Sequence, residues 1–519
     1  MVSYAHNLSL CFERTVNAAP EAVALRMRDR GDVSYAALDR LSNQIANWLT
    51  GEGVRPGDVV GLFHNKSLVA YASMLACLKG GFIYTNLDSD SPWERLRKIV
   101  LACRPARVLT FADRHNHVDK LAKQDIPTLN MQSPQICDSV ARCSDQPHPA
   151  PVTLTGASPA YIMFTSGSTG MPKGAVMSHA NLINFVGWVA QTFEIGPGDL
   201  LSGANPMYFD NSVFDSYASL FTGAALLPLT VDEVRDPRRI VQIVNASHCT
   251  IWFSVPSLLV YLLTTRALES DDFPSVRKLI FGGEGFPKPK LKQLFDMFGE
   301  RIQFENVYGP TECTCICSAH QITVDDFQDM RSLTMLGCLA DNFDYDILPV
   351  DTSDPDFGEL FLKGSQVGLG YFNDSERTSQ SFVQNPTHQD YRDIGYRTGD
   401  LVRRDERQQL HFKGRTDFQI KHMGYRIELE EIEAALATIP AVTECAVIYH
   451  QVAEGMGQIV GFAALSKHHD PEVDLISQVA DIVPSYMVPR QIRILAALPK
   501  NANGKIDRNQ LQQQTAGTP

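Results

Sequence analysis

The chain lacks a basic excess, a long apolar run and any internal repeat, and each absence excludes a class of function. Its 46 lysines and arginines are outnumbered by 59 acidic residues, for a net charge of −13. General nucleic-acid binding needs a basic surface to neutralise phosphates. No stretch approaches the ~20 apolar residues of a membrane-spanning helix, and the N-terminus has no basic and apolar signal regions. We therefore expect a cytoplasmic protein with neither nucleic-acid nor membrane partners.

The cysteines do not form a disulfide framework pattern. There are eleven, an odd number spread over a long chain, which favours free thiols. Cys313, Cys315 and Cys317 alternate with single residues between them. Zinc sites use wider ligand spacing, so the alternation predicts a strand with three thiols on one face. Metal binding is the weaker interpretation.

The length and the apolar periodicity predict the architecture. A chain of 519 residues exceeds the ~250–300 at which one hydrophobic core stops growing, so at least two domains are expected. Helical spacing of apolar residues over 34–49 and 67–78 alternates with strand candidates at 58–63 and 81–84. This alternation predicts an α/β fold with parallel sheets flanked by helices. Residues 120–150 are rich in Pro, Gln, Ser and His, which predicts a surface connection.

The sequence changes character after Gly414. A glutamate-rich amphipathic helix is expected over 427–439, and two short strands follow it. About 100 residues is enough for an independent small domain. We predict a large N-terminal domain at 1–416 and a small, mobile α+β domain at 417–519.

The strongest chemical signal is a strand that runs into Thr165-Ser-Gly-Ser-Thr-Gly-Met-Pro-Lys173. Glycines allow backbone N–H groups to approach an anion closely. The hydroxyls add donors, and Lys173 adds a positive charge. The segment therefore predicts a polyphosphate cradle, although it lacks the Gly-x-x-x-x-Gly-Lys-Ser/Thr pattern of P-loop proteins. A flexible surface loop is the alternative.

This loop resembles the phosphate-binding signature of the adenylate-forming superfamily, which includes acyl-CoA synthetases, luciferases and amino-acid adenylation domains. Further segments resemble that family's motifs and follow in its order. They are Asn306-Val-Tyr-Gly-Pro-Thr-Glu312, Tyr396-Arg-Thr-Gly-Asp-Leu401, Gly414-Arg-Thr-Asp-Phe-Gln-Ile-Lys421, Gly424-Tyr-Arg-Ile-Glu428 and Leu498-Pro-Lys-Asn-Ala-Asn-Gly-Lys505-Ile-Asp507. Together they span nearly the whole chain.

The resemblance implies ATP and Mg²⁺ as cofactors. It assigns catalysis to Lys505, Thr165 and Glu312, with Glu312 and Thr165 as the Mg²⁺ ligands, and hard oxygen ligands suit this ion. Lys505 would act where negative charge builds in the transition state. The residues implied in nucleotide binding are Thr165, Ser166, Gly167, Ser168, Thr169, Gly170, Lys173, Asn306, Tyr308, Thr311, Asp400 and Arg415.

The resemblance also implies a rotation of the small domain after adenylate formation. The hinge corresponds to Asp417, which lies between two separate cores. Lys421 and Gly424 belong to the segment that would approach the adenylate for thioester formation. Within the nucleotide site, Tyr308 offers a flat face for adenine and Asp400 accepts hydrogen bonds from the ribose hydroxyls.

The segment Tyr208-Phe-Asp210-Asn-Ser-Val-Phe214 resembles the substrate pocket of amino-acid adenylation domains. There the aspartate pairs with the substrate α-ammonium, because a buried cation needs a partner. Matching the family's pocket positions gives Asp210, Asn211, Phe214, Phe253, Ile280, Gly282, Val307, Cys315 and Ile316. This mostly apolar lining should exclude charged side chains. It is closest to pockets for isoleucine or valine, but Asn211 departs from that pattern and keeps alanine, proline and small polar amino acids open.

The expected function is activation of an amino acid as its adenylate and transfer to the phosphopantetheine thiol of a separate carrier protein. No carrier segment follows Lys505, so the chain resembles stand-alone adenylation enzymes of nonribosomal peptide synthesis and D-alanine–carrier-protein ligases. An acyl- or aryl-CoA synthetase is the main alternative. A luciferase-type oxygenase and an inactive binding protein are more remote, and the retained Lys173, Glu312 and Asp400 argue against the last.

Overall fold

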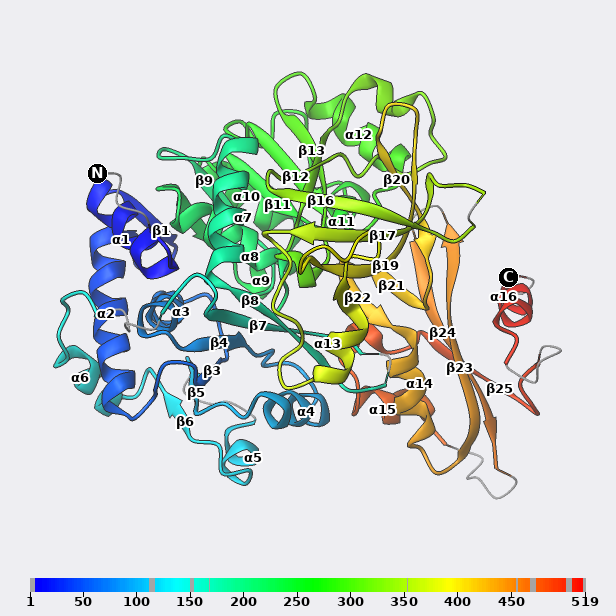
Figure 1. Cartoon of the computed structure of the whole chain (residues 1–519), viewed down its shortest axis with the longest axis horizontal. Coiled ribbons are helices and arrows are strands. Elements are labelled where there is room, and N and C mark those ends of the chain that lie inside the picture. The colour runs from blue at the N-terminus through cyan, green and yellow to red at the C-terminus, as the bar shows by residue number, and fades with distance from the viewer. Residues whose placement is uncertain are drawn as a thin grey trace.

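Two mostly parallel sheets form the centre of the N-terminal part of the chain (Figure 1). The computed structural model describes residues 5–111, 117–149, 154–167, 169–351, 353–453, 456–466, 473–500 and 506–516. The strand order of the first sheet is β15-β14-β13-β12-β11-β9-β10-β1-β2, and that of the second is β6-β5-β3-β4-β7-β8. Only the strands at the ends of this order, β2, β14, β15 and β8, pair in antiparallel fashion.

The strands of the nine-stranded sheet are β1 (Val23–Met27), β2 (Gly31–Ser34), β9 (Leu200–Gly203), β10 (Ala225–Pro228), β11 (Ile251–Ser254), β12 (Lys278–Gly282), β13 (Gln303–Tyr308), β14 (Ser318–Gln321) and β15 (Cys338–Leu339). Those of the six-stranded sheet are β3 (Val59–Leu62), β4 (Ile83–Asn86), β5 (Arg107–Thr110), β6 (Thr128–Asn130), β7 (Pro159–Thr165) and β8 (Lys173–Ser178). The phosphate-loop segment thus connects two paired strands, β7 and β8, with Thr165 opposite Lys173.

Helices cover both sheets. They are α1 (Leu8–Ala18), α2 (Tyr35–Gly51), α3 (Leu68–Gly80), α4 (Trp93–Cys103), α5 (Val118–Ala122), α6 (Pro134–Ala141), α7 (His179–Thr192), α8 (Asn211–Leu220), α9 (Val231–Arg235), α10 (Pro237–Ala246), α11 (Pro256–Thr264), α12 (Lys288–Phe298) and α13 (Ser375–Ser381). All ten residues of α8 are buried, and α3 is apolar on every face, as expected of a helix inside a large core. The hydroxyls of Tyr84 on β4 and Tyr217 on α8 lie 3.0 Å apart. One hydrophobic cluster therefore joins both sheets.

A five-stranded antiparallel sheet completes this part of the chain. Its strands are β16 (Phe343–Pro349), β17 (Phe357–Gly364), β18 (Phe382–Gln384), β19 (Ile394–Arg404) and β20 (Leu410–Arg415). The predicted α/β fold with parallel sheets is confirmed, but this antiparallel sheet was not predicted. Its strands carry short, irregular apolar alternation that does not distinguish them from loops.

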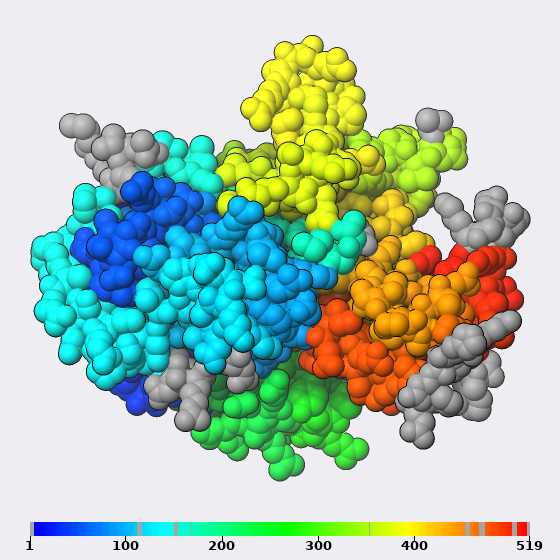
Figure 2. Space-filling view, turned by 90° about the horizontal axis from the view of Figure 1, so that it is seen from below, coloured from blue at the N-terminus to red at the C-terminus, as the bar shows by residue number. Residues whose placement is uncertain are grey.

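The C-terminal part has cores of its own. It contains a hairpin, β21 (Gln419–His422) and β22 (Tyr425–Glu428), then α14 (Leu429–Ala437), and a sheet of β23 (Val442–Ala453), β24 (Met456–Leu465) and β25 (Gln491–Leu495) with α15 (Leu475–Ala480) and α16 (Arg508–Ala516). Its two hydrophobic clusters contain no residue before Ile420. Figure 2 shows its orange and red surface directly beside the N-terminal blue and green surface. The predicted boundary after residue 416 falls between β20 and β21.

Three local predictions were wrong. Residues 120–150 contain part of α5, strand β6 and helix α6 instead of a plain connection, because short elements with polar faces leave little periodicity. The helix expected from 427 begins at Leu429, after β22. Cys313–Cys317 do not form a strand, since Thr314 and Cys315 have φ of 61° and 73°; all three thiols are buried and free.

None of the helices in the described ranges is both long and apolar enough to span a bilayer. The segments that carry the motifs instead cluster at one edge of the sheets. Thr165 ends β7 and Tyr308 ends β13, both at carboxyl ends of strands, where α/β sheets place ligand sites.

Candidate active site

The phosphate-loop segment closes tightly on itself. A Cβ on Gly167 would lie 2.1 Å from the Met171 carbonyl oxygen, so this position requires glycine. Lys98 on α4 donates to the Gly170 carbonyl at 2.7 Å, and Arg377 contacts the Thr169 hydroxyl. Neighbouring helices therefore hold the loop in place. Ser168, also predicted here, lies outside the described residues.

Thr165 and Glu312 bring oxygen ligands to one place. The Thr165 hydroxyl oxygen is buried and has no hydrogen-bond partner among the described residues. Glu312 is fully buried and accepts a hydrogen bond of 2.8 Å from the Tyr371 hydroxyl. Burial alone would raise the pKa of Glu312, but the positive charges of Arg426 and Lys173 outweigh it and lower this pKa to about 2. An ionised carboxylate beside an unpartnered hydroxyl fits a hard cation such as Mg²⁺.

The predicted nucleotide residues meet around Asp400 on β19. The Tyr308 hydroxyl donates to one carboxylate oxygen of Asp400 at 2.5 Å, and Arg415 pairs with the other. Asn306 donates its side-chain amide to the Met335 carbonyl at 2.8 Å. These four predicted side chains line a cavity of about 600 Å³ between the two parts of the chain. The volume and the flanking aromatic ring suit a nucleoside.

Asp210 lies at the start of α8, beside the phosphate loop. Its Oδ2 accepts a hydrogen bond of 2.5 Å from the Thr311 hydroxyl. Burial raises the pKa of Asp210, although the Thr311 hydrogen bond and the charges of Lys421 and Arg426 partly oppose this. A cation bound against this carboxylate would favour its ionised form.

A small cavity of about 50 Å³ joins the substrate and phosphate residues. Asp210, Asn211, Cys315 and Ile316 line it together with Thr165. The Asn211 side chain is buried and lies close to Gly283, where a Cβ would stand 3.5 Å from its Nδ2. Polar and apolar groups therefore meet in one small space.

The remaining predicted pocket residues lie in the core and not on this cavity wall. Phe214, Phe253, Ile280 and Val307 are each at most 2% exposed. The rings of Phe214 and Phe253 are 4.6 Å apart between centroids. At Gly282, a Cβ would meet the Val307 carbonyl oxygen at 2.4 Å, so a side chain there has no room. Their contact with a substrate stays a prediction.

The predicted hinge and thiol-path residues lie at the boundary between the two parts. Asp417 accepts from Arg415 Nε at 2.7 Å. Lys421 Nζ stands 5.8 Å from the centre of the Tyr308 ring, and burial lowers the pKa of this lysine. The Gly424 N–H donates to Glu284 Oε2 at 2.9 Å. Arg415 therefore connects the hinge carboxylate to Asp400.

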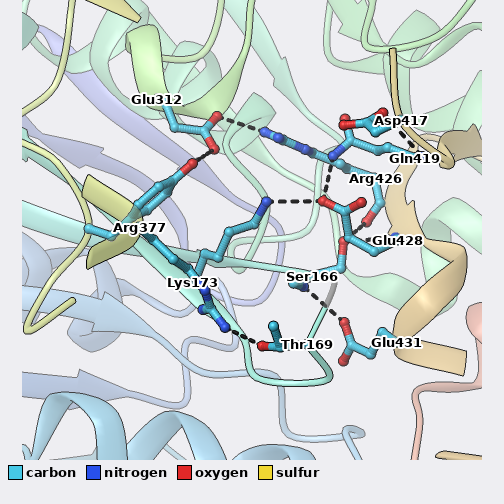
Figure 3. A network of polar contacts seen from close by, with 12 residues as sticks. Ser166, Thr169, Lys173, Glu312, Arg377, Asp417, Gln419, Arg426, Glu428 and Glu431 are labelled. Carbon is cyan, nitrogen blue, oxygen red and sulfur yellow. Dashed lines mark hydrogen bonds and ion pairs between the residues drawn. The ribbon is translucent and has the colours of Figure 1, made fainter. Parts of the chain in front are cut away.

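Segment 424–431 faces the phosphate loop (Figure 3). Lys173 Nζ and Glu428 Oε1 are 3.0 Å apart, and the Ser166 hydroxyl donates to the Arg426 carbonyl at 2.8 Å. Lys505 lies outside the described residues. Its described neighbours Lys500 and Ile506 contact β23 and a cluster within the C-terminal part.

Several residues at this boundary had no role predicted. They are Arg95, Glu284, Arg426, Glu428 and Glu431. The motif that contains Arg426 and Glu428 was recognised, but its charges gained no role because their partners are more than a hundred positions away. Arg95 and Glu284 lie in segments with no chemical pattern of their own.

Comparison with known proteins matches the family model AMP-binding enzyme over residues 12–372 and AMP-binding enzyme C-terminal domain over 431–505. The L-proline–[L-prolyl-carrier protein] ligase of Pseudomonas fluorescens is 31% identical, over 93% of this chain and 95% of its own. A linear gramicidin synthase of Brevibacillus parabrevis is 31% identical over 98% of this chain, which spans only 6% of that protein. The structure of holo-PA1221, an NRPS protein containing adenylation and PCP domains, has the same fold: TM-score 0.83, 24% identity, 98% of this chain and 85% of that one covered.

Proposed function

Because the chain belongs to the AMP-binding enzyme family, we propose that it is a ligase that uses ATP to activate an amino acid as its acyl-adenylate. The observation that carries this proposal is the position of Asp210. Its carboxylate lines the same cavity as Thr165 of the phosphate loop and Asp400 of the nucleotide site. A substrate whose ammonium contacts Asp210 therefore has its own carboxylate directed toward the phosphates of ATP.

The nucleotide would bind in the space between Tyr308 and the phosphate loop. Lys173 and the loop N–H groups would bind the β- and γ-phosphates. Thr165 and Glu312 would hold Mg²⁺, whose charge neutralises the phosphates during attack by the substrate carboxylate. The chain's own contribution is to position the two anions and to exclude water.

The substrate we propose is a small or branched apolar amino acid. The cavity beside Asp210 is small, and no second charged side chain comes from the pocket positions Asn211, Cys315 and Ile316. A charged substrate side chain would be buried without a partner. Isoleucine and valine differ by one methylene, worth about 1–3 kcal/mol, so their use should overlap.

We further propose that a separate carrier protein supplies the thiol acceptor. The similar proline ligase is named for a prolyl-carrier protein, and the hairpin turn at Gly424 lies on the cavity that contains Asp210. Free coenzyme A is the competing acceptor. A carboxylate for the substrate ammonium favours the carrier, because the coenzyme A ligases of the family activate acids without an ammonium.

Pyrophosphate exchange across a panel of acids tests the activation step. We expect exchange that depends on Mg²⁺ and ATP with small or branched apolar amino acids, and none with lysine or glutamate. Exchange with fatty or aryl acids alone would contradict the amino-acid assignment. Labelled amino acid with ATP and either acceptor then tests the second step. Turnover with coenzyme A and with no phosphopantetheinylated carrier would contradict the carrier assignment.

A further inference from the structure

Two carboxylates of the C-terminal part occupy donors of the phosphate loop. Glu428 Oε1 lies 3.0 Å from Lys173 Nζ. Glu431 Oε2 accepts a hydrogen bond of 3.2 Å from the Gly167 N–H. Both glutamates are at most 5% exposed. Charged groups are rarely buried so fully unless each has a partner.

A third group of the same segment occupies the proposed metal ligand. Arg426 Nη1 lies 2.6 Å from Glu312 Oε2. Segment 426–431 therefore presents one positive charge to the metal ligand and two negative charges to the phosphate donors. Mg²⁺ with pyrophosphate has the same arrangement of charges, so the segment and Mg²⁺-pyrophosphate compete for the same groups.

Backbone contacts and a second ion pair support this arrangement. The Ser166 hydroxyl donates to the Arg426 carbonyl at 2.8 Å and accepts from the Glu428 N–H at 3.2 Å. The other oxygen of Glu431 contacts Arg95 on α4. Arg95 is itself buried, so it holds Glu431 against the loop from the N-terminal side.

We propose that Glu428 and Glu431 replace the departed pyrophosphate on the phosphate loop and act as positioning residues for thioester formation. The inference rests on the proposed function. While pyrophosphate is bound, Lys173 and the Gly167 N–H are occupied and the hairpin cannot reach the adenylate. After it leaves, the two carboxylates satisfy the same donors and hold the turn at Gly424 over the cavity. Pyrophosphate is then a competitor of this docked orientation.

Glu428→Gln and Glu431→Gln test the proposal, because each keeps the shape of the side chain and removes its charge. Glu430→Gln is the matched control, since the charges that act on Glu430 all come from the C-terminal part. The first measurement is calorimetric binding of pyrophosphate alone and with Mg²⁺. Because the competing carboxylate is weakened, we expect the two test variants to bind pyrophosphate about 3- to 10-fold more tightly than the unmodified enzyme.

The second measurement separates the half-reactions. Thioester formation from supplied aminoacyl-adenylate should fall about 10-fold or more in Glu428→Gln and Glu431→Gln, while pyrophosphate exchange is kept or increased. The control should match the unmodified enzyme in all three assays. Tighter pyrophosphate binding also demonstrates a folded loop.

Unchanged or weaker pyrophosphate binding in both test variants would overturn the proposal, as would an equal loss of both half-reactions. Failure of the proposed function has a different signature. In that case the unmodified enzyme shows no exchange with any amino acid, while calorimetry still reports whether the two glutamates compete with pyrophosphate.

Discussion

The Thr311 hydroxyl donates a hydrogen bond of 2.5 Å to Asp210, across 101 positions of the chain. Thr311 lies one residue before the proposed metal ligand Glu312, so this bond connects the substrate carboxylate to the metal site. The bond engages only Oδ2 of Asp210. The second carboxylate oxygen, Oδ1, is the one we expect the substrate ammonium to contact.

Asp210→Asn should lower kcat/KM for the amino acid by about 10²-fold or more. Asparagine can still accept the Thr311 hydrogen bond, but it leaves the substrate ammonium unpaired, and breaking a buried ion pair costs about 3–5 kcal/mol. Pyrophosphate exchange at varied amino acid and varied ATP measures the effect. The KM for ATP is the internal control and should change little. An equal rise in both KM values would show that Asp210 does not bind the ammonium.

Lys505→Ala should lower adenylation by about 10²-fold or more, because it removes a charge aimed at the transition state. Thioester formation from supplied adenylate should be affected far less. Lys500→Ala is the matched control: Lys500 pairs with Glu444 at the surface, and such pairs are worth at most about 1 kcal/mol. Equal loss of both half-reactions in Lys505→Ala would contradict the proposed domain rotation.

Gly424→Ala should reduce thioester formation about 10-fold or more and spare pyrophosphate exchange. Gly424 has a φ of +80°, and a Cβ would stand 2.6 Å from Val255 Cγ1, so even a methyl group forces the turn away from the cavity. Gly424→Trp should abolish the step. Gly53→Ala is the control, because Gly53 has a φ of +87° with nothing within 4 Å. Full thioester activity in Gly424→Ala would refute this role.

Asp88→Asn should stabilise the protein near neutral pH. Burial raises the pKa of Asp88 to about 6, with smaller opposing effects from the Asp90 N–H and Arg95. The unfolded value is about 3.9, so the folded state binds the proton more tightly. The stability contributed by Asp88 is complete below pH 4 and is lost as pH rises through 6, by at most about 3 kcal/mol.

Thermal unfolding at pH 5 and pH 7.5 measures this effect. The Tm advantage of Asp88→Asn over the unmodified protein should be larger at pH 7.5. Asp29→Asn, at an exposed position, should show no such dependence. An advantage that shrinks as pH rises would contradict the sign of the linkage.

Much of the fold could be predicted because its signals are local. Ser34 and Ser67 precede apolar helical patterns, and both cap the helices α2 and α3 as such residues do. The strands at 58–63 and 81–84 are apolar and short, and both exist as β3 and β4. The error at Cys313–Cys317 has a local cause as well, since two consecutive residues with positive φ are not encoded by glycine.

The candidate site could be predicted as a set of residues but not as an arrangement. The motifs named Thr165, Lys173, Glu312 and Asp400 because their chemistry depends on residue type and order. Nothing in those motifs indicated that Glu428 would pair with Lys173, because a contact between distant segments depends on how two domains pack.

The sequence by itself determined the family, the α/β fold and the groups that can bind phosphate, since these depend on periodicity and on short segments of specific composition. Only the tertiary structure decided which face of the C-terminal part opposes the phosphate loop. That choice depends on ion pairs such as Lys173–Glu428, whose partners are 255 positions apart, and on burial that converts weak surface charges into strong partners. The physical reason is that charge pairing becomes selective only where folding has removed the surrounding water.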